Sequence, residues 1–277
     1  MDSIVFSHGN GFPASTYRVL FEALQARGFA LHAVEKFGHD PAYPVTDNWP
    51  HLVRQLTDFA QPIAAQTDRL WLVGHSLGGF LSLMAAAQQP TLAAGVVLLD
   101  SPLVGGWRAR TLQVVKRTPL MQRVSPSAVS RRRRKAWKDR DAVLQHFRTK
   151  PAFAVWDPRV LADYVEHGTT DADEPSSQGQ AAAEASARIL SFDRDVETRI
   201  YDALPHQLDR LFKRHPLQCP VAFVGGRQSA ELRRTGLTLT RRIAGDRIAM
   251  IDGSHLFPME RPEATAEAVG AAIGSMG

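Results

Sequence analysis

A serine flanked by two glycines is the first group in this chain whose spacing suggests chemistry. Ser76 is the centre of the Gly-His-Ser-Leu-Gly run at residues 74–78, which follows a short apolar stretch and precedes an alanine-rich one. A serine on a tight strand-to-helix turn adopts strained backbone angles, and glycines two residues to either side let the strand and the helix pass close together. The helix N-terminus would favour the negative charge of an acyl-transfer intermediate. We therefore predict that Ser76 is a nucleophile.

A neutral serine hydroxyl is a weak nucleophile, so Ser76 needs a base within hydrogen-bond reach and a carboxylate that orients the base. The candidate base is His255, in the Ile-Asp-Gly-Ser-His-Leu-Phe-Pro run at residues 251–258. This histidine follows the last predicted strand, so its loop should lie at the same edge of the sheet as Ser76. His8 and His75, which lie beside other predicted site residues, are expected to support backbone geometry instead.

Backbone amides must stabilise the oxyanion that forms when a serine attacks an acyl carbon. One N–H should come from Leu77, the residue after the nucleophile, and a second from the loop that follows the first strand. That loop is the glycine-rich run at residues 7–13, where a backbone amide can face a substrate without an obstructing side chain. Asn10 is the first choice for the second amide, and Gly11 is the alternative.

The elements that must position these residues alternate along the chain. Apolar runs typical of buried strands cover Ser3–Ser7, Ala30–Lys36, Leu70–Val73, Gly95–Asp100, Val221–Val224 and Arg247–Ile251. Helical patterns between them cover Ser15–Arg27, His51–Ala65, Leu77–Gln89, Glu231–Ala244 and Pro262–Ile273. This alternation predicts an α/β fold with a mostly parallel, doubly wound sheet, whose functional site lies at the carboxyl ends of the strands.

The regular alternation is interrupted between the fourth and the fifth predicted strand. We assign residues 1–104 and 207–277 to the core and residues 105–206 to a largely helical cap inserted over the site. Aromatic residues in this segment either line an apolar pocket for an acyl or aryl group or fasten the cap to the core. They include Trp107, Trp137, Phe147, Phe153, Trp156, Tyr164 and Tyr201.

Charge is unevenly distributed within the predicted cap. The first half is basic and centres on the run Arg131–Lys135, whereas the second half, Asp157–Glu197, is acidic, so the two halves are expected to pair. The stretch Thr169–Ala187 has the composition of an exposed loop. Contact of the basic run with an anionic membrane surface is the less favoured interpretation, compared with a solvated helix face that pairs with the acidic half.

Length and composition limit the classes of protein to which the chain can belong. Its 277 residues, 44% of them hydrophobic, can bury a full core. We expect a soluble, cytoplasmic protein, because no apolar stretch is long enough to span a bilayer and the N-terminus lacks a secretory signal pattern. Cys219 is the only cysteine, which excludes an internal disulfide and a cysteine-based metal site. No nucleic-acid-binding module, phosphate loop or dinucleotide fingerprint occurs, so no nucleic-acid partner, cofactor or metal is expected.

Four motifs in this order resemble those of the α/β-hydrolase superfamily: HGNGFP at 8–13, GHSLGG at 74–79, VVLLDSP at 96–102 and GSHLFPMERPE at 253–263. The resemblance implies the α/β-hydrolase fold with an inserted cap. The family order of nucleophile, acid and histidine agrees with Ser76, Asp100 and His255. The first strand already carries the His-Gly turn, so the two leading antiparallel strands usual in the family are missing. Either this member is minimal at that edge or the chain is truncated.

The acid departs from the family pattern, which usually places an aspartate in a G-x-x-D segment after the next-to-last strand. Residues 226–229 are Gly-Arg-Gln-Ser, with a serine in that place. Asp100 is our preferred acid, because a carboxylate at the end of a buried strand is costly unless it is paired. A minority of the family, including some small acyl esterases with a similar GGxS segment, is similar in that its acid follows the strand after the nucleophile helix. Glu231 is the alternative acid, and Asp252 is a distant third.

These residues predict a serine hydrolase that cleaves a carboxylic ester or a related acyl compound of small size. An acyltransferase, a thioesterase, a C–C bond hydrolase and a cofactor-free perhydrolase stay open, because the same triad serves each of them. The serine argues against the dehalogenases and epoxide hydrolases of the superfamily, which use an aspartate nucleophile. The alternative from another class is a non-catalytic ligand-binding or receptor protein on the same scaffold, which Ser229 in the usual place of the acid favours.

Overall fold

The central sheet brings the ends of six parallel strands side by side. The computed structural model describes residues 1–103, 126–172 and 188–277. The strands are β1 (Ser3–Ser7), β2 (Ala30–Ala33), β3 (Leu70–His75), β4 (Gly95–Leu99), β8 (Val221–Gly226) and β9 (Ile248–Ile251). Their order is β2-β1-β3-β4-β8-β9, and every neighbouring pair is parallel. The predicted fold class is therefore confirmed.

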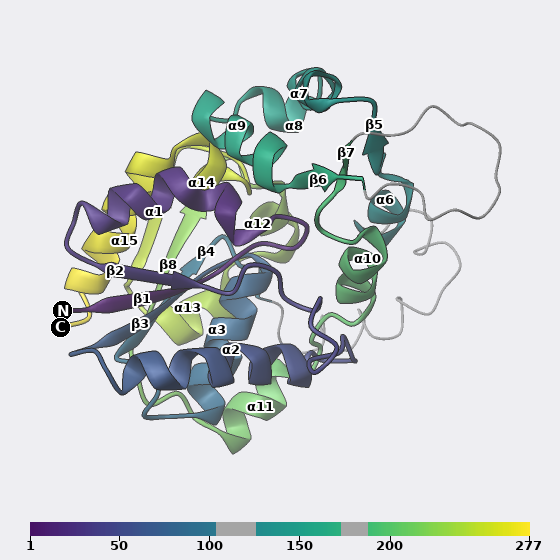
Figure 1. The fold of residues 1–277 in the computed structure, drawn as a ribbon. Coiled ribbons are helices and arrows are strands. Elements are labelled where there is room, and N and C mark those ends of the chain that lie inside the picture. Colours follow the sequence, from purple (N-terminus) through teal and green to yellow (C-terminus); the bar gives the residue numbers. More distant parts are fainter. Residues whose placement is uncertain (104–125, 173–187) are drawn as a thin grey trace.

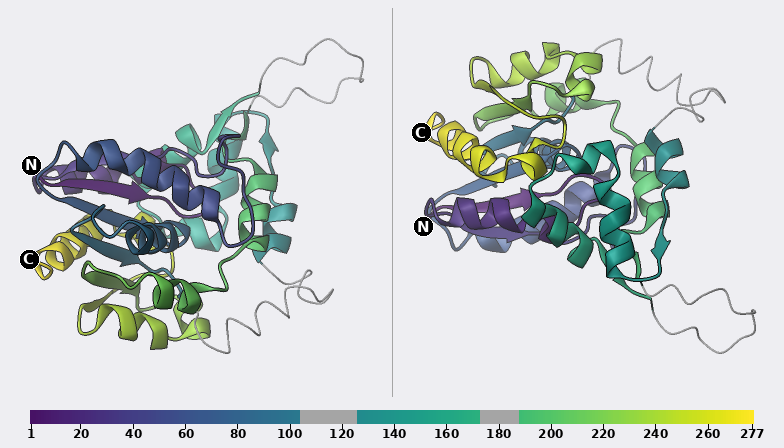
Figure 2. Two further views of the ribbon diagram at one scale, coloured as in Figure 1. Left: turned by 90° about the horizontal axis from the view of Figure 1, so that it is seen from below. Right: turned by 90° about the horizontal axis from the view of Figure 1, so that it is seen from above.

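Helices cover both faces of this sheet (Figures 1 and 2). One face carries α1 (Arg18–Gln25) and α15 (Pro262–Gly274), and the other carries α2 (Pro50–Ala64), α3 (Leu77–Gln88) and α13 (Thr238–Ala244). The four central strands β1, β3, β4 and β8 are buried along their whole length. Their near-continuous runs of Val, Leu, Ile and Phe suit strands that are covered on both sides. The carboxyl ends of these strands consequently project from a rigid layer.

Three predicted elements differ clearly from those of the structure, whereas others, such as β3 and β8, differ only by one or two residues at an end. The strand predicted over Ala30–Lys36 ends at Ala33, whose partner Phe6 is next to the end of β1. The helix predicted over Ser15–Arg27 begins as a 3₁₀ turn at Ala14–Tyr17 before α1. The helix predicted over Glu231–Ala244 is two helices, α12 (Ala230–Thr235) and α13, separated at Gly236, whose φ of 72° no α-helix accommodates. Additional helices are α11 (Leu208–Arg214) and α14 (Phe257–Glu260).

The described residues 126–172 and 188–206, which lie between β4 and β8 in the sequence, form a further layer beyond the carboxyl ends of the central strands (Figures 1 and 2). We call these residues the insertion. It contains α6 (Pro126–Arg132), α7 (Arg140–Arg148), α8 (Pro151–Ala154), α9 (Pro158–His167) and α10 (Arg194–Asp202). In addition to the expected helices, it holds a three-stranded antiparallel sheet of order β5-β7-β6, formed by β5 (Ala136–Trp137), β6 (Thr169–Asp171) and β7 (Arg188–Leu190).

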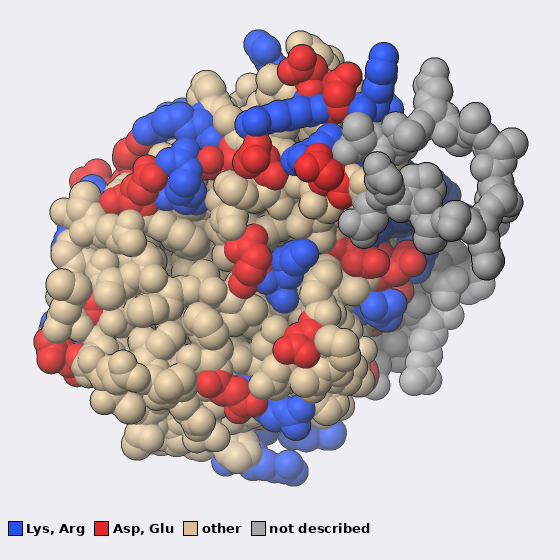
Figure 3. All heavy atoms as spheres, viewed as in Figure 1, with Lys and Arg blue, Asp and Glu red and all other residues tan. Residues whose placement is uncertain are grey.

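Ion pairs join the basic and the acidic parts of the insertion, as expected. Arg133 Nη1 lies 2.6 Å from Glu197 Oε2, and Arg140 Nη2 lies 2.7 Å from Glu166 Oε2. Figure 3 shows blue and red side chains intermixed over the upper part of this face, rather than separated into single-sign fields. The loop predicted over Thr169–Ala187 begins instead as β6, and its residues 173–187 lie outside the described chain.

The aromatic residues of the insertion mostly pack on one another. Ring centroids lie 4.7 Å apart for Phe147 and Phe153, 4.5 Å for Phe153 and Trp156, and 5.6 Å for Phe12 and Trp156. These contacts support the fastening role, because Phe12 belongs to the loop after β1. Phe147 and Phe153 also line an open cavity of about 690 Å³. Trp107 lies outside the described residues.

Both chain termini lie together at the end of the sheet that faces away from the insertion (Figure 1). Met1 contacts Asp68, and Arg69 donates to the carbonyl of Gly277. Within the described part of the chain, no helix has the length and the apolar character that crossing a membrane requires.

Candidate active site

Ser76, His255 and Asp100 lie in one line of hydrogen bonds at the carboxyl ends of the strands. His255 Nε2 is 3.0 Å from Ser76 Oγ, and His255 Nδ1 is 2.7 Å from Asp100 Oδ2. Ser76 follows β3, Asp100 follows β4 and His255 follows β9, so three strand ends bring together residues far apart in sequence. The Asp100 side chain is fully buried, and that of His255 is 19% exposed. This geometry can move a proton from a serine hydroxyl to an imidazole that a carboxylate orients.

The turn that holds Ser76 is tight and strained, as its sequence predicts. Ser76 has φ 51° and ψ −111°, a backbone conformation that residues other than glycine rarely adopt. A Cβ on Gly74 would lie 2.2 Å from the carbonyl carbon of Gly78, and a Cβ on Gly78 would lie 1.9 Å from the carbonyl oxygen of Ser7. Because these neighbours are backbone atoms, only glycine allows β1, β3 and α3 to approach so closely.

Asp100 is held by two donors from the end of β8. The N–H of Gly226 donates to Oδ1 at 2.7 Å, and the Ser229 hydroxyl donates to Oδ2 at 2.6 Å. Asp100 itself has a φ of 44°. The residue that stands in the usual place of the acid thus binds the carboxylate of the neighbouring strand. Sequence reasoning missed this role of Ser229, although its position in the G-x-x-D segment was the available signal.

The two other carboxylates considered for the acid lie elsewhere. Glu231 is in the first turn of α12, and Asp100, not Glu231, is hydrogen-bonded to His255. Asp252 pairs with Arg227 across 3.4 Å, and the Asp252 side chain is 69% exposed. The geometry therefore favours Asp100 for the acid position.

The loop after β1, which we call the oxyanion loop (residues 8–13), lies next to Ser76 and is held on both sides. Its Gly9 N–H donates to the hydroxyl of Tyr17, and its Phe12 N–H donates to the carbonyl of Gly9. Asn10 and Gly11 lie between these occupied amides, which is where the sequence places the oxyanion donor. The Asn10 side chain donates to the carbonyl of Glu197 at 3.0 Å, so α10 of the insertion contacts this loop.

The remaining predicted donor is Leu77. It is the first residue of α3, so its N–H has no acceptor within the helix. The Ser76 N–H donates to the carbonyl of Leu99, and Ser101 Oγ donates to the carbonyl of Ser76 at 3.0 Å, which fixes the turn before the helix. A carbonyl oxygen of a substrate bound at Ser76 could accept from the helix N-terminus.

His8 and His75 support backbone geometry, as expected from the sequence. His8 Nδ1 donates to the carbonyl of Gly9, and its Nε2 accepts from the N–H of Phe37 at 2.9 Å. Burial lowers the pKa of His8 to about 4 and that of His75 to about 3, so both rings are neutral near pH 7. Among the described residues, no three His, Cys, Asp or Glu side chains gather as metal ligands.

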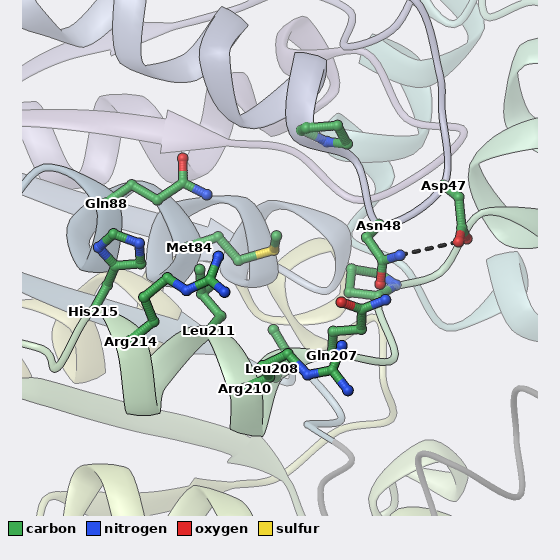
Figure 4. Close-up of a pocket in the computed structure, with 12 residues that line it drawn as sticks. Asp47, Asn48, Met84, Gln88, Gln207, Leu208, Arg210, Leu211, Arg214 and His215 are labelled. Carbon is green, nitrogen blue, oxygen red and sulfur yellow. Dashed lines mark hydrogen bonds between the residues drawn. The ribbon is translucent and has the colours of Figure 1, made fainter.

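A separate hollow of about 390 Å³ lies between α2, α3 and α11 (Figure 4). Met84 and Gln88 line it from α3, and Leu211 and Arg214 line it from α11. Met84 is about two helical turns from Ser76. The hollow is therefore distinct from the hydrogen-bonded line of Ser76, His255 and Asp100.

Comparison with curated proteins finds relatives among hydrolases. The chain is 30% identical to the monoglyceride lipase of Rattus norvegicus over 106 residues, which cover 36% of this chain and 35% of the rat enzyme. It is 31% identical to the pyrethroid hydrolase of Sphingobium wenxiniae over 104 residues, 36% of each chain. The matched segments thus span about a third of the length of these relatives.

Solved structures share the fold over nearly the whole chain. E-2-(acetamidomethylene)succinate hydrolase has a TM-score of 0.72 at 20% identity and covers 99% of this chain and 92% of its own. The peroxisomal alpha-beta-hydrolase Lpx1 of Saccharomyces cerevisiae has a TM-score of 0.73 at 16% identity and covers 99% and 76%. A family model described as the alpha/beta hydrolase family matches residues 4–268. With this match and the sheet described above, the chain belongs to the alpha/beta hydrolase family.

Proposed function

We propose that this protein is a serine hydrolase that cleaves a carboxylic ester, or a related acyl compound, through an acyl-enzyme. The observation that carries the proposal is the line from Ser76 through His255 to Asp100, with distances of 3.0 Å and 2.7 Å. These distances are within the range of a working nucleophile and base. The strained turn at Ser76 and the helix N-terminus beside it add support, because a purely binding protein needs neither.

In the proposed reaction, His255 Nε2 takes the Ser76 proton while Ser76 Oγ bonds to the acyl carbon of the substrate. The imidazolium that forms keeps its proton on Nδ1 and donates it in a hydrogen bond to Asp100, whose charge stabilises the cation. Collapse of the tetrahedral intermediate expels the alcohol, which receives the proton from Nε2. A water molecule then attacks the acyl-enzyme: it gives a proton to Nε2 while its oxygen bonds to the acyl carbon. The bond between Ser76 Oγ and the acyl carbon breaks, Oγ takes the proton back from Nε2, and the acid leaves.

The oxyanion of each intermediate is assigned to the N–H groups of Leu77 and Asn10, with Gly11 as the alternative to Asn10. Leu77 suits this role because α3 leaves its amide without an internal acceptor. Asn10 suits it because the amides of Gly9 and Phe12 on either side already have acceptors. Removing one such donor typically lowers kcat by about 100-fold or more.

We further propose that the insertion, within residues 105–206, acts as the cap and selects the substrate. Its position beyond the strand ends supports this role, and α10 contacts the oxyanion loop through Asn10. The rat relative is a monoglyceride lipase and the Sphingobium relative a pyrethroid hydrolase. Their names agree with an ester of a small molecule as the substrate of this chain.

The first test is covalent labelling with a fluorophosphonate, read by intact mass. The parent protein should gain a single stoichiometric adduct, which Ser76→Ala abolishes and His255→Ala slows by several orders of magnitude. Ser15→Ala and His215→Ala, both remote from the line of hydrogen bonds, serve as matched controls and should label like the parent.

Labelling then leads to a panel of 4-nitrophenyl esters of increasing acyl length, followed by glycerol monoesters. Turnover that disappears in Ser76→Ala would assign ester hydrolysis to this site. A folded parent protein that neither forms an adduct nor turns over any ester would contradict the proposal and favour a non-catalytic binding protein.

A further inference from the structure

Two buried side chains that take no part in the proposed bond making connect the loops on either side of Ser76. Tyr17 is 1% exposed and His75 is fully buried. The N–H of Gly9 donates to Tyr17 Oη at 2.9 Å, Tyr17 Oη lies 2.7 Å from His75 Nδ1, and His75 Nε2 lies 2.9 Å from the carbonyl oxygen of His255. We call these three hydrogen bonds the Tyr17–His75 relay. It runs from the oxyanion loop to the loop of the proposed base.

Each proton in the relay follows from its partners. The carbonyl of His255 can only accept, so His75 Nε2 carries a proton and donates it. Since burial holds the His75 ring neutral, Nδ1 has a free lone pair and accepts from the Tyr17 hydroxyl. The Tyr17 oxygen in turn accepts from Gly9. Every polar atom of the relay is therefore satisfied, and the donors all point in one direction along it.

His75 is a rigid reference point for both loops. It is the last residue of β3, it pairs with Leu99 of β4, and Ser76 follows it directly. A single side chain on the strand of the nucleophile thus sets the distance to the oxyanion loop on one side and to His255 on the other. Its ring centroid is 5.2 Å from that of His255, so a neutral His75 also avoids a second cation beside the imidazolium.

We propose that Tyr17 and His75 are positioning residues for the reaction of Ser76. The Tyr17–His75 relay holds the oxyanion loop with its Asn10 amide, and the imidazole of His255, in fixed places relative to the nucleophile. The inference rests on the proposed function. A role in packing alone is the alternative, because the Tyr17 and His75 rings also contact each other, with centroids 5.9 Å apart. Packing alone would change stability and leave turnover intact.

Three substitutions interrupt the relay at different points. Tyr17→Phe keeps the ring and removes the hydroxyl, which cuts the bond to Gly9. His75→Asn keeps an acceptor near the Nδ1 position and loses the donor to His255, whereas His75→Gln restores a donor near the Nε2 position. Thr265→Val is the matched control: Thr265 lies on α15 and is fully buried, and its hydroxyl donates to the carbonyl of Arg261, the residue before this helix.

The measurements are kcat and KM for 4-nitrophenyl butyrate, the rate of inactivation by a fluorophosphonate, and the free energy of unfolding in urea. We expect Tyr17→Phe and His75→Asn to lower kcat and the inactivation rate together, by about 10- to 100-fold, since misplacement of reacting groups acts on the chemical step. KM should stay within about twofold of the parent value. His75→Gln should recover part of the activity that His75→Asn loses, and Thr265→Val should lose stability with kcat unchanged.

The outcomes separate this inference from the proposed function. If the relay variants are folded and destabilised like Thr265→Val but react at the parent rate, the relay only packs, and the serine hydrolase proposal stands. If the folded parent protein neither labels nor turns over the ester, the proposed function fails and the positioning role fails with it. Should Tyr17→Phe not fold, the contrast between His75→Asn and His75→Gln decides the question.

Discussion

The sheet core and the insertion hold their important residues by different means. In the core, backbone atoms do the holding: the turn at Ser76 leaves no room for one more carbon at Gly78, and the N–H of Gly226 donates to Asp100. In the insertion, side chains hold one another, as in the Arg133–Glu197 ion pair and the cluster around Trp156. A site that is held by close backbone contacts keeps its geometry only with its present residues. A layer that is held by contacts between side chains can be repacked with other side chains. The proposed chemistry accordingly lies in the core and the proposed substrate choice in the insertion.

The largest effect should come from the carboxylate of the core. Asp100→Asn keeps an acceptor for Gly226 but presents an amide to His255, which favours the wrong tautomer of the base, so kcat should fall by about 10³- to 10⁴-fold. Glu231→Gln is the control and should stay near the parent value. Steady-state ester hydrolysis measures both variants. Near-normal turnover in Asp100→Asn together with its loss in Glu231→Gln would transfer the acid role to Glu231.

A single methyl group should disrupt the backbone contact beneath the nucleophile. Gly78→Ala places a Cβ 1.9 Å from the Ser7 carbonyl oxygen, so we expect the free energy of unfolding to fall by about 3 kcal/mol or more. The control is Gly274→Ala, where no atom lies within 4 Å of the added carbon. Urea titration compares the two. Equal stability of both variants would show that the backbone around Gly78 can shift to accommodate the added carbon more readily than its close contacts indicate.

The insertion should respond to a single change and tolerate a paired one. Arg133→Met leaves the carboxylate of Glu197, 5% exposed, without its cation, which should cost about 3 kcal/mol of unfolding free energy. The double variant Arg133→Met with Glu197→Leu removes both charges and should regain most of that loss. Urea unfolding of the single and double variants tests this contrast. If the double variant is as unstable as the single one, the insertion, like the core, cannot be repacked.

Stability of the core should fall in mild acid. Because burial lowers the pKa of His8 to about 4 and of His75 to about 3, the unfolded chain takes up protons below its ordinary pKa of 6.5 and the folded chain does not. The unfolding free energy should therefore drop as pH falls from 6.5 towards 4, by about 1.4 kcal/mol per pH unit for each histidine. Urea titrations across this range measure the slope. His8→Asn should reduce this slope by about 1.4 kcal/mol per pH unit, the contribution of one histidine. An unchanged slope would contradict the lowered pKa of His8.

The smallest effect should come from the surface of the insertion. Arg140 and Glu166 form an ion pair whose side chains are 59% and 45% exposed. Water screens such a pair, so Arg140→Gln should change the unfolding free energy by no more than about 0.5 kcal/mol, and less at high salt. Thermal unfolding at two salt concentrations provides the check. A larger, salt-dependent loss would mean that surface charges help to hold the insertion.

Local patterns predicted the elements whose boundaries depend on their own residues. The run Ser3–Ser7 forms β1 as predicted, because all five of its residues are buried where they stand. The strand predicted to Lys36 stops at Ala33, which pairs with Phe6 next to the end of β1, so its length depends on pairing with another part of the chain. The break at Gly236 was available as a turn signal, but the helical pattern on both sides obscured it.

The site shows the same division between local and tertiary information. Motifs identified Ser76 and His255, and a strand end identified Asp100, whose roles stay predictions. The hydroxyl of Ser229 on Asp100 and that of Tyr17 on His75 join residues 129 and 58 positions apart. The serine in the usual place of the acid was a signal for the first contact, whereas no local pattern shows the second. The antiparallel sheet of the insertion likewise depends on pairing between short, unpatterned segments.

Ser76 and Asp100 both occupy backbone conformations with positive φ, at 51° and 44°. Such strain costs about 1 to 3 kcal/mol at each position, and glycine would relieve it. Selection for stability alone would therefore favour glycine at position 76, whereas at position 100 glycine would also remove the carboxylate that accepts from Gly226 and Ser229. A related protein that kept this fold without the proposed chemistry should therefore accept glycine at position 76 readily, so the identity of that residue is a criterion for separating members that use the proposed chemistry from members that do not.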